Sequence, residues 1–194
     1  MVCGTVFDEN GDPARQVTVV ANYLGPHSGP IPSTRSYNTG NYCLDNVPFG
    51  QSMLSVDDPE HGYPSMWSSF YNAKPLDQQS NNTVELSSAH PDVTMDIRIP
   101  YKAAFVTIHL TDANTGAVKS SMIYDLEAQA TPGGRTMTGS QDTDDALLIP
   151  PNENILLKVR APGYREWPYD GSPGYLLNLP PGEHKTIDVP LQSK

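Results

Sequence analysis

Proline and glycine interrupt this sequence so often that long helices are excluded from nearly all of it. The 194 residues include 19 prolines and 15 glycines, which leave only a few short segments free of both. Proline breaks a helix interior, and glycine loses more conformational entropy there than other residues do. Short apolar and β-branched runs lie between these breakers, for example at residues 17–21. The sequence therefore predicts an all-β fold of short strands and turns.

The net charge of the chain argues against two classes of binding partner. Twelve basic and 22 acidic residues give a formal net charge of −10. This charge repels nucleic acid and anionic lipid, and no basic stripe offsets the repulsion. The longest apolar runs, such as residues 146–151, are far shorter than the roughly 20 residues that span a bilayer. We therefore expect neither nucleic acid as a partner nor membrane insertion of this chain.

The second half of the chain repeats the order of features found in the first half. Each half contains a strand, an Asp/Asn/Gly turn, a second strand, a proline-containing segment, a Leu-x-Val strand, a Gly-Tyr pair with a later tryptophan, and a closing Thr-x-Asp strand. In the first half these features lie at residues 4–8, 9–13, 17–21, 44–48, 54–56, 62–67 and 94–97. In the second they lie at residues 106–110, 112–116, 122–128, 147–151, 157–159, 163–167 and 186–189. The pattern predicts two domains, 1–100 and 101–194, each with six or seven short strands.

The two cysteines lie on separate predicted strands. Strand alternation places Cys3 on the face opposite Val2 and Val6, and Cys43 on the face opposite its apolar neighbours. A bridge between them would close a loop of 40 residues, worth about 4 kcal/mol in the chain-entropy model. We expect this disulfide if the strands are neighbours and the protein is exported. Two buried free thiols are the alternative, and the sequence leaves it open.

Cysteine usage and the start of the chain together suggest a compartment. Met1 is followed directly by a predicted strand at residues 2–7, and no charged and apolar leader is visible. We interpret this as an exported protein, periplasmic, cell-surface or extracellular, whose signal peptide is missing from the sequence in hand. A disulfide would agree with that compartment, because disulfides persist in oxidising environments.

The first repeat resembles a known family. The resemblance lies in residues 3–13, 17–19, 39–50, 54–56 and 62–63, and covers roughly residues 2–65. These segments are similar to the carboxypeptidase regulatory-like domain, a transthyretin-like β-sandwich appended to metallocarboxypeptidases, outer-membrane receptors and many bacterial surface proteins. Gly11, Gly40 and Gly50 fall where tight turns call for a positive φ. The second repeat is a degenerate copy, with Ala146 at a position where the first has the Gly-x-Tyr entry to its middle strand.

The resemblance implies a fold and a context but no catalytic residues. It implies two tandem antiparallel transthyretin-like sandwich domains of the Ig-like, Greek-key type, acting as accessory modules. Fold alone does not specify a function.

The spacing of the histidine, cysteine and serine residues does not match the known motifs of catalytic or metal sites. The five histidines are never closer than 19 residues, and no HExxH, CxxC or Gly-x-Ser-x-Gly motif occurs. The C-terminal residues 191–194 lack the Tyr-Arg-Gly-Ser ending of the related hydroxyisourate hydrolases. Two acidic clusters, at residues 57–60 and 142–145, offer oxygen ligands for calcium, but solvated loop carboxylates are the preferred interpretation. We expect no cofactor, no metal ligand and no catalytic residue.

Aromatic residues after each Leu-x-Val strand are the best candidates for a ligand surface. Exposed rings on loops suit stacking on sugars or peptides, whereas buried rings would instead close the ends of each sandwich. The candidate ligand-binding residues are Tyr63, Trp67, Tyr71, Tyr164, Trp167 and Tyr169, with Phe70 and Tyr175 beside them.

Three functional classes follow from these features. The first is a non-catalytic, exported module that contacts a protein or glycan at the cell envelope. The second is a carbohydrate-binding module that uses the aromatic loops, and the third is a hydrolase or oxygenase on the same fold. The sequence gives no oligomeric state.

Overall fold

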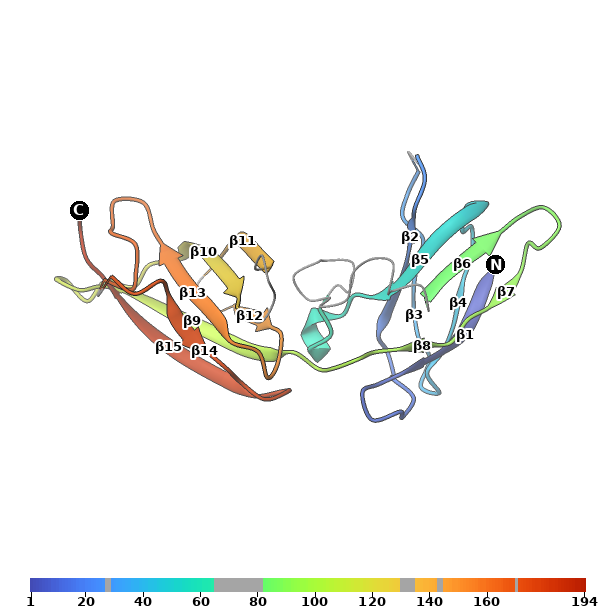
Figure 1. Ribbon diagram of the computed structural model, residues 1–194, viewed down its shortest axis with the longest axis horizontal. Coiled ribbons are helices and arrows are strands. Elements are labelled where there is room, and N and C mark those ends of the chain that lie inside the picture. Colours follow the sequence, from blue (N-terminus) through green and yellow to red (C-terminus); the bar gives the residue numbers. More distant parts are fainter. Residues whose placement is uncertain (27–28, 65–81, 130–134, 143–144, 170) are drawn as a thin grey trace. The chain divides into compact units, whose positions relative to one another are not determined.

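The computed structural model describes residues 1–26, 29–64, 82–129, 135–142, 145–169 and 171–194 (Figure 1). The chain divides into two compact units, Met1–Lys102 and Ala103–Lys194. Each unit is described by itself below.

Unit 1 is built from short strands, as expected from its frequent turns. Its two sheets have the strand orders β4-β1-β7, with β8 also paired to β1, and β3-β2-β5-β6. A 3-10 turn, η1 (Pro59–His61), follows β5. The strands are β1 (Val2–Phe7), β2 (Thr18–Tyr23), β3 (Ser33–Arg35), β4 (Asn41–Leu44), β5 (Gly50–Val56), β6 (Thr83–Leu86), β7 (Val93–Thr94) and β8 (Ile97–Arg98).

The first strand of unit 1 is the centre of its first sheet. β1 pairs antiparallel with β4 and parallel with both β7 and β8. Val2 and Val6 point into the core with no exposed surface, and Tyr42 and Leu44 of β4 are each 1% exposed. Their strand neighbours Cys3 and Cys43 therefore lie on the outer face of the sheet, as strand alternation predicted.

Glycine is required at position 4 because another segment of backbone approaches it. Between β7 and β8, the Met95 N–H donates to the Cys3 carbonyl at 2.8 Å, and the buried Tyr42 hydroxyl donates to the Met95 carbonyl at 2.6 Å. A Cβ at Gly4 would lie 1.8 Å from that same carbonyl oxygen. The missing side chain thus makes room for the crossing between β7 and β8.

Unit 2 has the same order of strands. Its sheets read β12-β9-β15 and β11-β10-β13-β14. In both units the first strand lies between the fourth and the last, and the second lies between the third and the fifth. The strands are β9 (Ala104–Asp112), β10 (Ser121–Ala128), β11 (Arg135–Asp142), β12 (Ala146–Ile149), β13 (Ile155–Arg160), β14 (Tyr175–Leu177) and β15 (His184–Leu191).

The core of unit 2 comes from alternate residues of its long strands. β9 and β15 pair in parallel over eight residues. On β15 the side chains of Ile187, Val189 and Leu191 are buried, while those between them are exposed. Leu126 of β10 and Leu157 of β13, which lie opposite each other in the second sheet, are almost fully buried as well. This alternation is the pattern of a two-layer sandwich with one dry face per sheet.

The expectation of an all-β fold is confirmed, since no α-helix occurs among the described residues. The predicted turn glycines Gly11, Gly40 and Gly50 have φ values of 88°, 78° and 108°. At Gly40 a Cβ would also lie 2.8 Å from the Val6 carbonyl oxygen, so both conformation and space select glycine. In the described part of the chain, no helix has the length and apolar character needed to cross a membrane.

Candidate functional site

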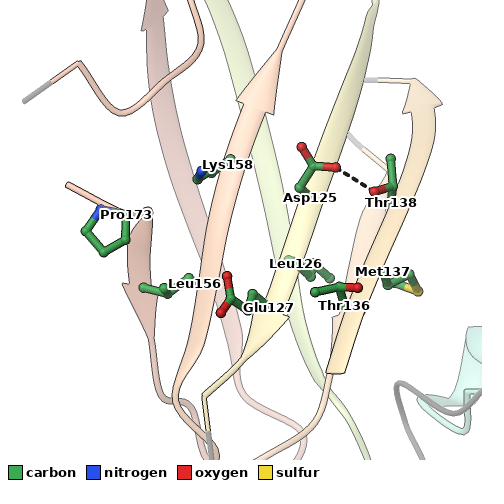
Figure 2. Close-up of a pocket in the computed structure, with 9 residues that line it drawn as sticks. All are labelled: Asp125, Leu126, Glu127, Thr136, Met137, Thr138, Leu156, Lys158 and Pro173. Carbon is green, nitrogen blue, oxygen red and sulfur yellow. Dashed lines mark hydrogen bonds between the residues drawn. The ribbon is translucent and has the colours of Figure 1, made fainter. Parts of the chain in front are cut away.

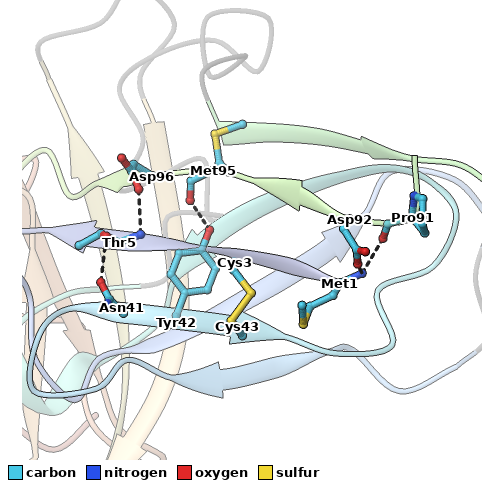
Figure 3. Close-up of a disulfide and its surroundings, with 10 residues drawn as sticks. All are labelled: Met1, Cys3, Thr5, Asn41, Tyr42, Cys43, Pro91, Asp92, Met95 and Asp96. Atoms are coloured by element: carbon cyan, nitrogen blue, oxygen red, sulfur yellow. Dashed lines mark hydrogen bonds and ion pairs between the residues drawn. A yellow bond between two sulfur atoms is a disulfide. The ribbon is translucent and has the colours of Figure 1, made fainter. Parts of the chain in front are cut away.

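The cysteines form the first feature that bears on function. Cys3 and Cys43 are directly opposite each other in the β1–β4 pair, with Cα atoms 4.1 Å apart, and the structure joins them in a disulfide (Figure 3). The sequence predicted the outer face for both residues but could not show that their strands are neighbours. The bridge ties β1, the central strand of its sheet, to β4 at the end of the same sheet.

Further contacts hold the same sheet around the disulfide. The Thr5 N–H donates to the Asp96 carboxylate at 2.8 Å, and the Met1 ammonium donates to the Pro91 carbonyl at 2.6 Å (Figure 3). Burial, followed by the negative charge of Asp96, raises the pKa of Tyr42 well above its ordinary value. Tyr42 is therefore a neutral donor that holds the β7–β8 crossing.

The Gly-Tyr pair noted in each half has a common role in the structure. Gly62 and Gly163 have φ values of 84° and 83°, and the tyrosine after each reaches back to the end of the first strand of its unit. The Tyr63 hydroxyl lies 3.3 Å from Glu9 Oε2, and the Tyr164 hydroxyl donates to Asp112 Oδ2 at 2.7 Å. We call each of these contacts a tyrosine tie.

Each tyrosine tie lies at the turn after the first strand of its unit, and an aspartate carboxylate accepts hydrogen bonds from the backbone of that turn. Asp8 Oδ1 accepts from the N–H groups of Asn10 and Asp12, both at 2.9 Å. In unit 2, Asp112 Oδ1 accepts from the N–H groups of Asn114 and Thr115 at the same distance. The turn after the first strand is therefore fixed by its own aspartate and tied to a distant loop by a tyrosine.

Each tyrosine tie contains one residue whose pKa is shifted from its ordinary value. The hydrogen bond from Tyr164, with those from the Thr115 and Asn114 backbone, lowers the pKa of Asp112 to about 2. Burial, followed by the charges of Glu9 and Asp8, raises the pKa of Tyr63 to about 12. At neutral pH, Asp112 is therefore a charged acceptor and Tyr63 is a neutral donor.

The aromatic residues predicted to bind a ligand differ from one another in exposure and in their contacts. Tyr63 is only 9% exposed, so little of its ring faces solvent. Trp67 and Tyr71 lie outside the described residues. Tyr164 and Trp167 are partly buried. The Tyr169 hydroxyl donates to the Pro190 carbonyl at 3.0 Å and accepts from the Gln192 N–H at 2.8 Å.

Trp167 belongs to a small aromatic group in unit 2. Its backbone pairs with that of Val159, which places the indole beside β13. The ring centroids of Trp167 and Tyr175 lie 5.2 Å apart at an interplanar angle of 30°. The Lys185 ammonium lies 5.6 Å from the Tyr175 centroid. Both rings are partly exposed and lie side by side, so together they offer a small aromatic surface.

A shallow hollow of about 220 Å³ lies on the outer face of the second sheet of unit 2 (Figure 2). Thr138 of β11 donates to Asp125 of β10 across its rim at 2.6 Å, and Lys158 of β13 lies on the other side. The hollow is lined by Asp125, Leu126, Glu127, Thr136, Met137, Thr138, Leu156, Lys158 and Pro173. Sequence patterns did not indicate it, because it depends on which strands are neighbours.

The acidic cluster at residues 57–60 agrees with the expectation of solvated carboxylates at Asp57 and Glu60, which are exposed, and departs from it at Asp58, which is buried. Asp58 is 3% exposed, and one of its oxygens lies 2.9 Å from His61 Nδ1. Burial, and then the charge of Asp58, raises the pKa of Asp57. Residues 143 and 144 of the other acidic cluster lie outside the described residues. Within the described part, no three His, Cys, Asp or Glu side chains are placed to hold a metal ion.

Three exposed apolar side chains lie at one end of unit 1. Leu24 and Ile31 belong to the β2–β3 connection, and Phe49 directly precedes β5. The Leu24 N–H donates to the Gln51 carbonyl at 2.9 Å, which places these connections at the same end of the sheet. The three are 46%, 61% and 59% exposed, and we call them the apolar loop end. Sequence reasoning missed them, because exposure is not visible in single apolar residues within loops.

Comparison with known proteins gives no family assignment. No family model matches the chain, and no curated protein matches it. Among solved structures it is similar to the Bacillus anthracis TIE protein, with 10% identity and a TM-score of 0.39 over 99% of this chain and 34% of that one. It is similar to a streptococcal ancillary pilin, with 13% identity and a TM-score of 0.38 over 100% of this chain and 62% of that one.

A third similar structure is the shaft pilin SpaA of Lactobacillus rhamnosus GG, with 10% identity and a TM-score of 0.36 over 100% of this chain and 97% of that one. The present chain thus spans about a third of the first of these structures and under two thirds of the second. Similarity at this level determines neither the fold type nor the function of this chain.

Proposed function

We propose that this chain is an exported, non-catalytic binding or structural module that acts through protein contacts at the cell envelope. The observation that carries the proposal is the Cys3–Cys43 disulfide, formed between directly paired strands on the outer face of a sheet. Disulfides of this kind persist in the periplasm, at cell surfaces and outside cells, and they are rare in the cytosol.

The shared strand order supports the finer part of the proposal. Two units of about equal length repeat one arrangement of strands, one turn aspartate and one tyrosine tie. We infer two tandem copies of a transthyretin-like sandwich, with the second copy lacking the disulfide. Rigid sandwiches of this kind present their loops and edges to partners, as accessory modules do.

The apolar loop end of unit 1 is the proposed contact surface. Leu24, Ile31 and Phe49 come from two separate connections and all face solvent. Exposed apolar side chains that gather at one end of a rigid domain are typical of sites that bind another protein. A partner protein with an apolar patch fits this surface better than nucleic acid does, given the net charge of −10.

Export is tested in cells of the source organism by fractionation together with trapping of free thiols by alkylation. We expect the chain outside the cytosol with both cysteines protected until a reductant is added. A cytosolic protein with two alkylated thiols would overturn the proposal.

The contact surface is tested with the variants Ile31→Ser and Phe49→Ser in binding to isolated cell envelopes. Both should reduce envelope binding about tenfold or more, because truncated apolar anchors cost 1–2 kcal/mol or more. Val118→Ser is the matched control, since Val118 is 73% exposed in unit 2. Equal binding by all variants would assign the contact to another surface.

Carbohydrate binding is the second candidate, and the Trp167–Tyr175 pair is the observation that favours it. The variant Trp67→Phe leaves Trp167 as the only tryptophan. Acrylamide quenching of this variant that soluble glycans relieve would support stacking on a sugar. Emission that no glycan changes would remove the candidate.

A further inference from the structure

One edge of unit 2 lacks the features by which proteins protect exposed strands. β11 pairs with β10 over all eight of its residues in a continuous register, Ser121↔Asp142 to Ala128↔Arg135. It is the last strand in its sheet, and no described strand pairs with its other side. Its side chains alternate between partly buried and exposed without a bulge. Proteins usually shorten, twist or charge such an edge, or place proline or lysine in it.

The other sheet edges of the described chain do show such protection. β3 and β14 have three residues each, β4, β6 and β12 have four, and β7 and β8 have two. β15 is as long as β11, but it contains Lys185 and Pro190. β11 contains neither proline nor lysine, and its only charged residues, Arg135 and Asp142, stand at its ends. It is therefore the one long unprotected edge among the described strands.

The sequence of β11 is also complementary to itself. When two antiparallel strands are related by a two-fold axis normal to the sheet, each face continues across the pair, so only residues of the same face lie opposite each other. A register centred on Thr138 satisfies this condition over residues 135–141. It places Thr138 opposite Thr138, Thr136 opposite Ser140 and Arg135 opposite Gln141 of a second copy.

This register contains no unfavourable pair. Thr–Thr and Thr–Ser neighbours across strands stabilise a sheet, and no two like charges lie opposite each other. Met137 falls opposite Gly139 of the second copy, where the ring of Tyr124 covers the space that a Cβ would need. Methionine beside an aromatic ring is a favourable contact. A centre on Gly139 would instead place Thr136 opposite the charged Asp142.

We propose that the chain forms a two-fold dimer in which β11 of one copy pairs antiparallel with β11 of another, centred on Thr138. The pairing joins two four-stranded sheets into one continuous sheet. A contact of one strand pair is small, so the dimer dissociates on dilution. Because each chain carries a charge of −10 while residues 135–141 carry only Arg135, added salt should strengthen the dimer by screening the repulsion between copies. This association is independent of the envelope role proposed above.

Sedimentation velocity over a wide protein concentration range tests the dimer, with Thr138→Lys as the diagnostic variant. In the monomer the new lysine lies beside Asp125, which accepts from both Thr138 and Arg160, so a carboxylate remains next to the added charge and the fold should be kept. In the dimer two lysines face each other, and we expect dimerisation to weaken about tenfold or more. Leu176→Lys is the matched control, because Leu176 is 55% exposed on β14, at the opposite edge of the same sheet.

Cysteine crosslinking tests the register and captures a weak dimer. Both native cysteines are in the disulfide, so an added cysteine is the only free thiol. With a short bis-maleimide, Thr138→Cys should crosslink to itself, whereas Ser140→Cys, exposed on the same strand, should crosslink only when mixed with Thr136→Cys. The proposal fails if the Thr138→Cys protein stays monomeric, if Ser140→Cys alone crosslinks as well, or if Thr138→Lys dimerises like the unmodified chain.

Discussion

Tyr164 donates a 2.7 Å hydrogen bond from its hydroxyl to Oδ2 of Asp112, 52 residues earlier in the chain. The other oxygen of Asp112 accepts from the backbone of the following turn. One carboxylate therefore joins the end of β9 to the loop after β13. The corresponding tie in unit 1 joins Tyr63 to Glu9, so both halves fasten the same two regions.

The Asp112 tie predicts a stability that depends on pH in the acid range. The folded-state pKa of about 2 lies below the ordinary value of 3.8, so the tie stabilises the fold fully above about pH 4 and loses this effect as the pH falls towards 2. Tyr164→Phe should lower the melting temperature at pH 7, and the difference from the unmodified protein should shrink between pH 4 and about 2.

Thermal melts followed by circular dichroism across this range check the prediction, with Tyr169→Phe as the control. The Tyr169 hydroxyl bonds to the Pro190 carbonyl and the Gln192 N–H, and neither group titrates, so its variant should differ from the unmodified protein by an amount that does not follow this pH range. A Tyr164→Phe deficit that stays constant down to pH 2 would contradict the role given to the Asp112 charge.

The raised pKa of Tyr63 predicts a stability that falls with rising pH in the alkaline range. Its folded-state pKa of about 12 is above the ordinary value of 10, so its stabilising effect is complete below pH 10 and is lost as the pH rises towards 12. The absorbance difference between the unmodified protein and Tyr63→Phe reports this phenol alone. We expect the difference to titrate near pH 12, and titration near pH 10 would show that Tyr63 is not held by burial and its acidic neighbours.

Loss of the disulfide should destabilise unit 1 and leave unit 2 unchanged. In the chain-entropy model, the 40-residue separation of Cys3 and Cys43 gives a stabilisation of about 4 kcal/mol. We expect the double variant Cys3→Ser, Cys43→Ser to lose roughly this amount. Hydrogen exchange resolved by peptide should show faster exchange in β1 and β5 and unchanged exchange in β9 and β15. Reductant should have the same effect on the unmodified protein and none on the variant.

The variant Gly4→Ala should strongly destabilise the protein although it adds only one methyl group. The new Cβ would overlap the Met95 carbonyl, which already accepts from Tyr42, so β7 and β8 must shift. We expect a loss of about 3 kcal/mol, the upper part of the usual cost of overpacking, measured by urea denaturation. Thr5→Ala, the next residue of the same strand, should cost much less. An equal loss of unfolding free energy for both variants would mean that the segment between β7 and β8 moves aside at little cost.

Several local features could be predicted from the sequence because they depend on near neighbours. Glycines at positions 11, 40 and 50 occupy turns with positive φ, as their spacing indicated. The outward placement of Cys3 followed from strand alternation alone. The aromatic residues were harder to place, because the same loop residue can stack on a ligand or serve the fold. Tyr63 is almost wholly buried in the structure, which no local pattern distinguishes from exposure.

The sequence by itself determined that this chain is all-β, where its turns lie, and which face of its strand each cysteine occupies. These properties depend on backbone preferences and a two-residue period that act within a few residues. Only the tertiary structure decided that β1 lies beside β4, that Tyr164 reaches Asp112, and that β11 is an edge strand with no described strand on its outer side. Strand neighbours are chosen by packing and hydrogen bonding between segments far apart in the chain, and the sequence of one segment alone does not specify its partner.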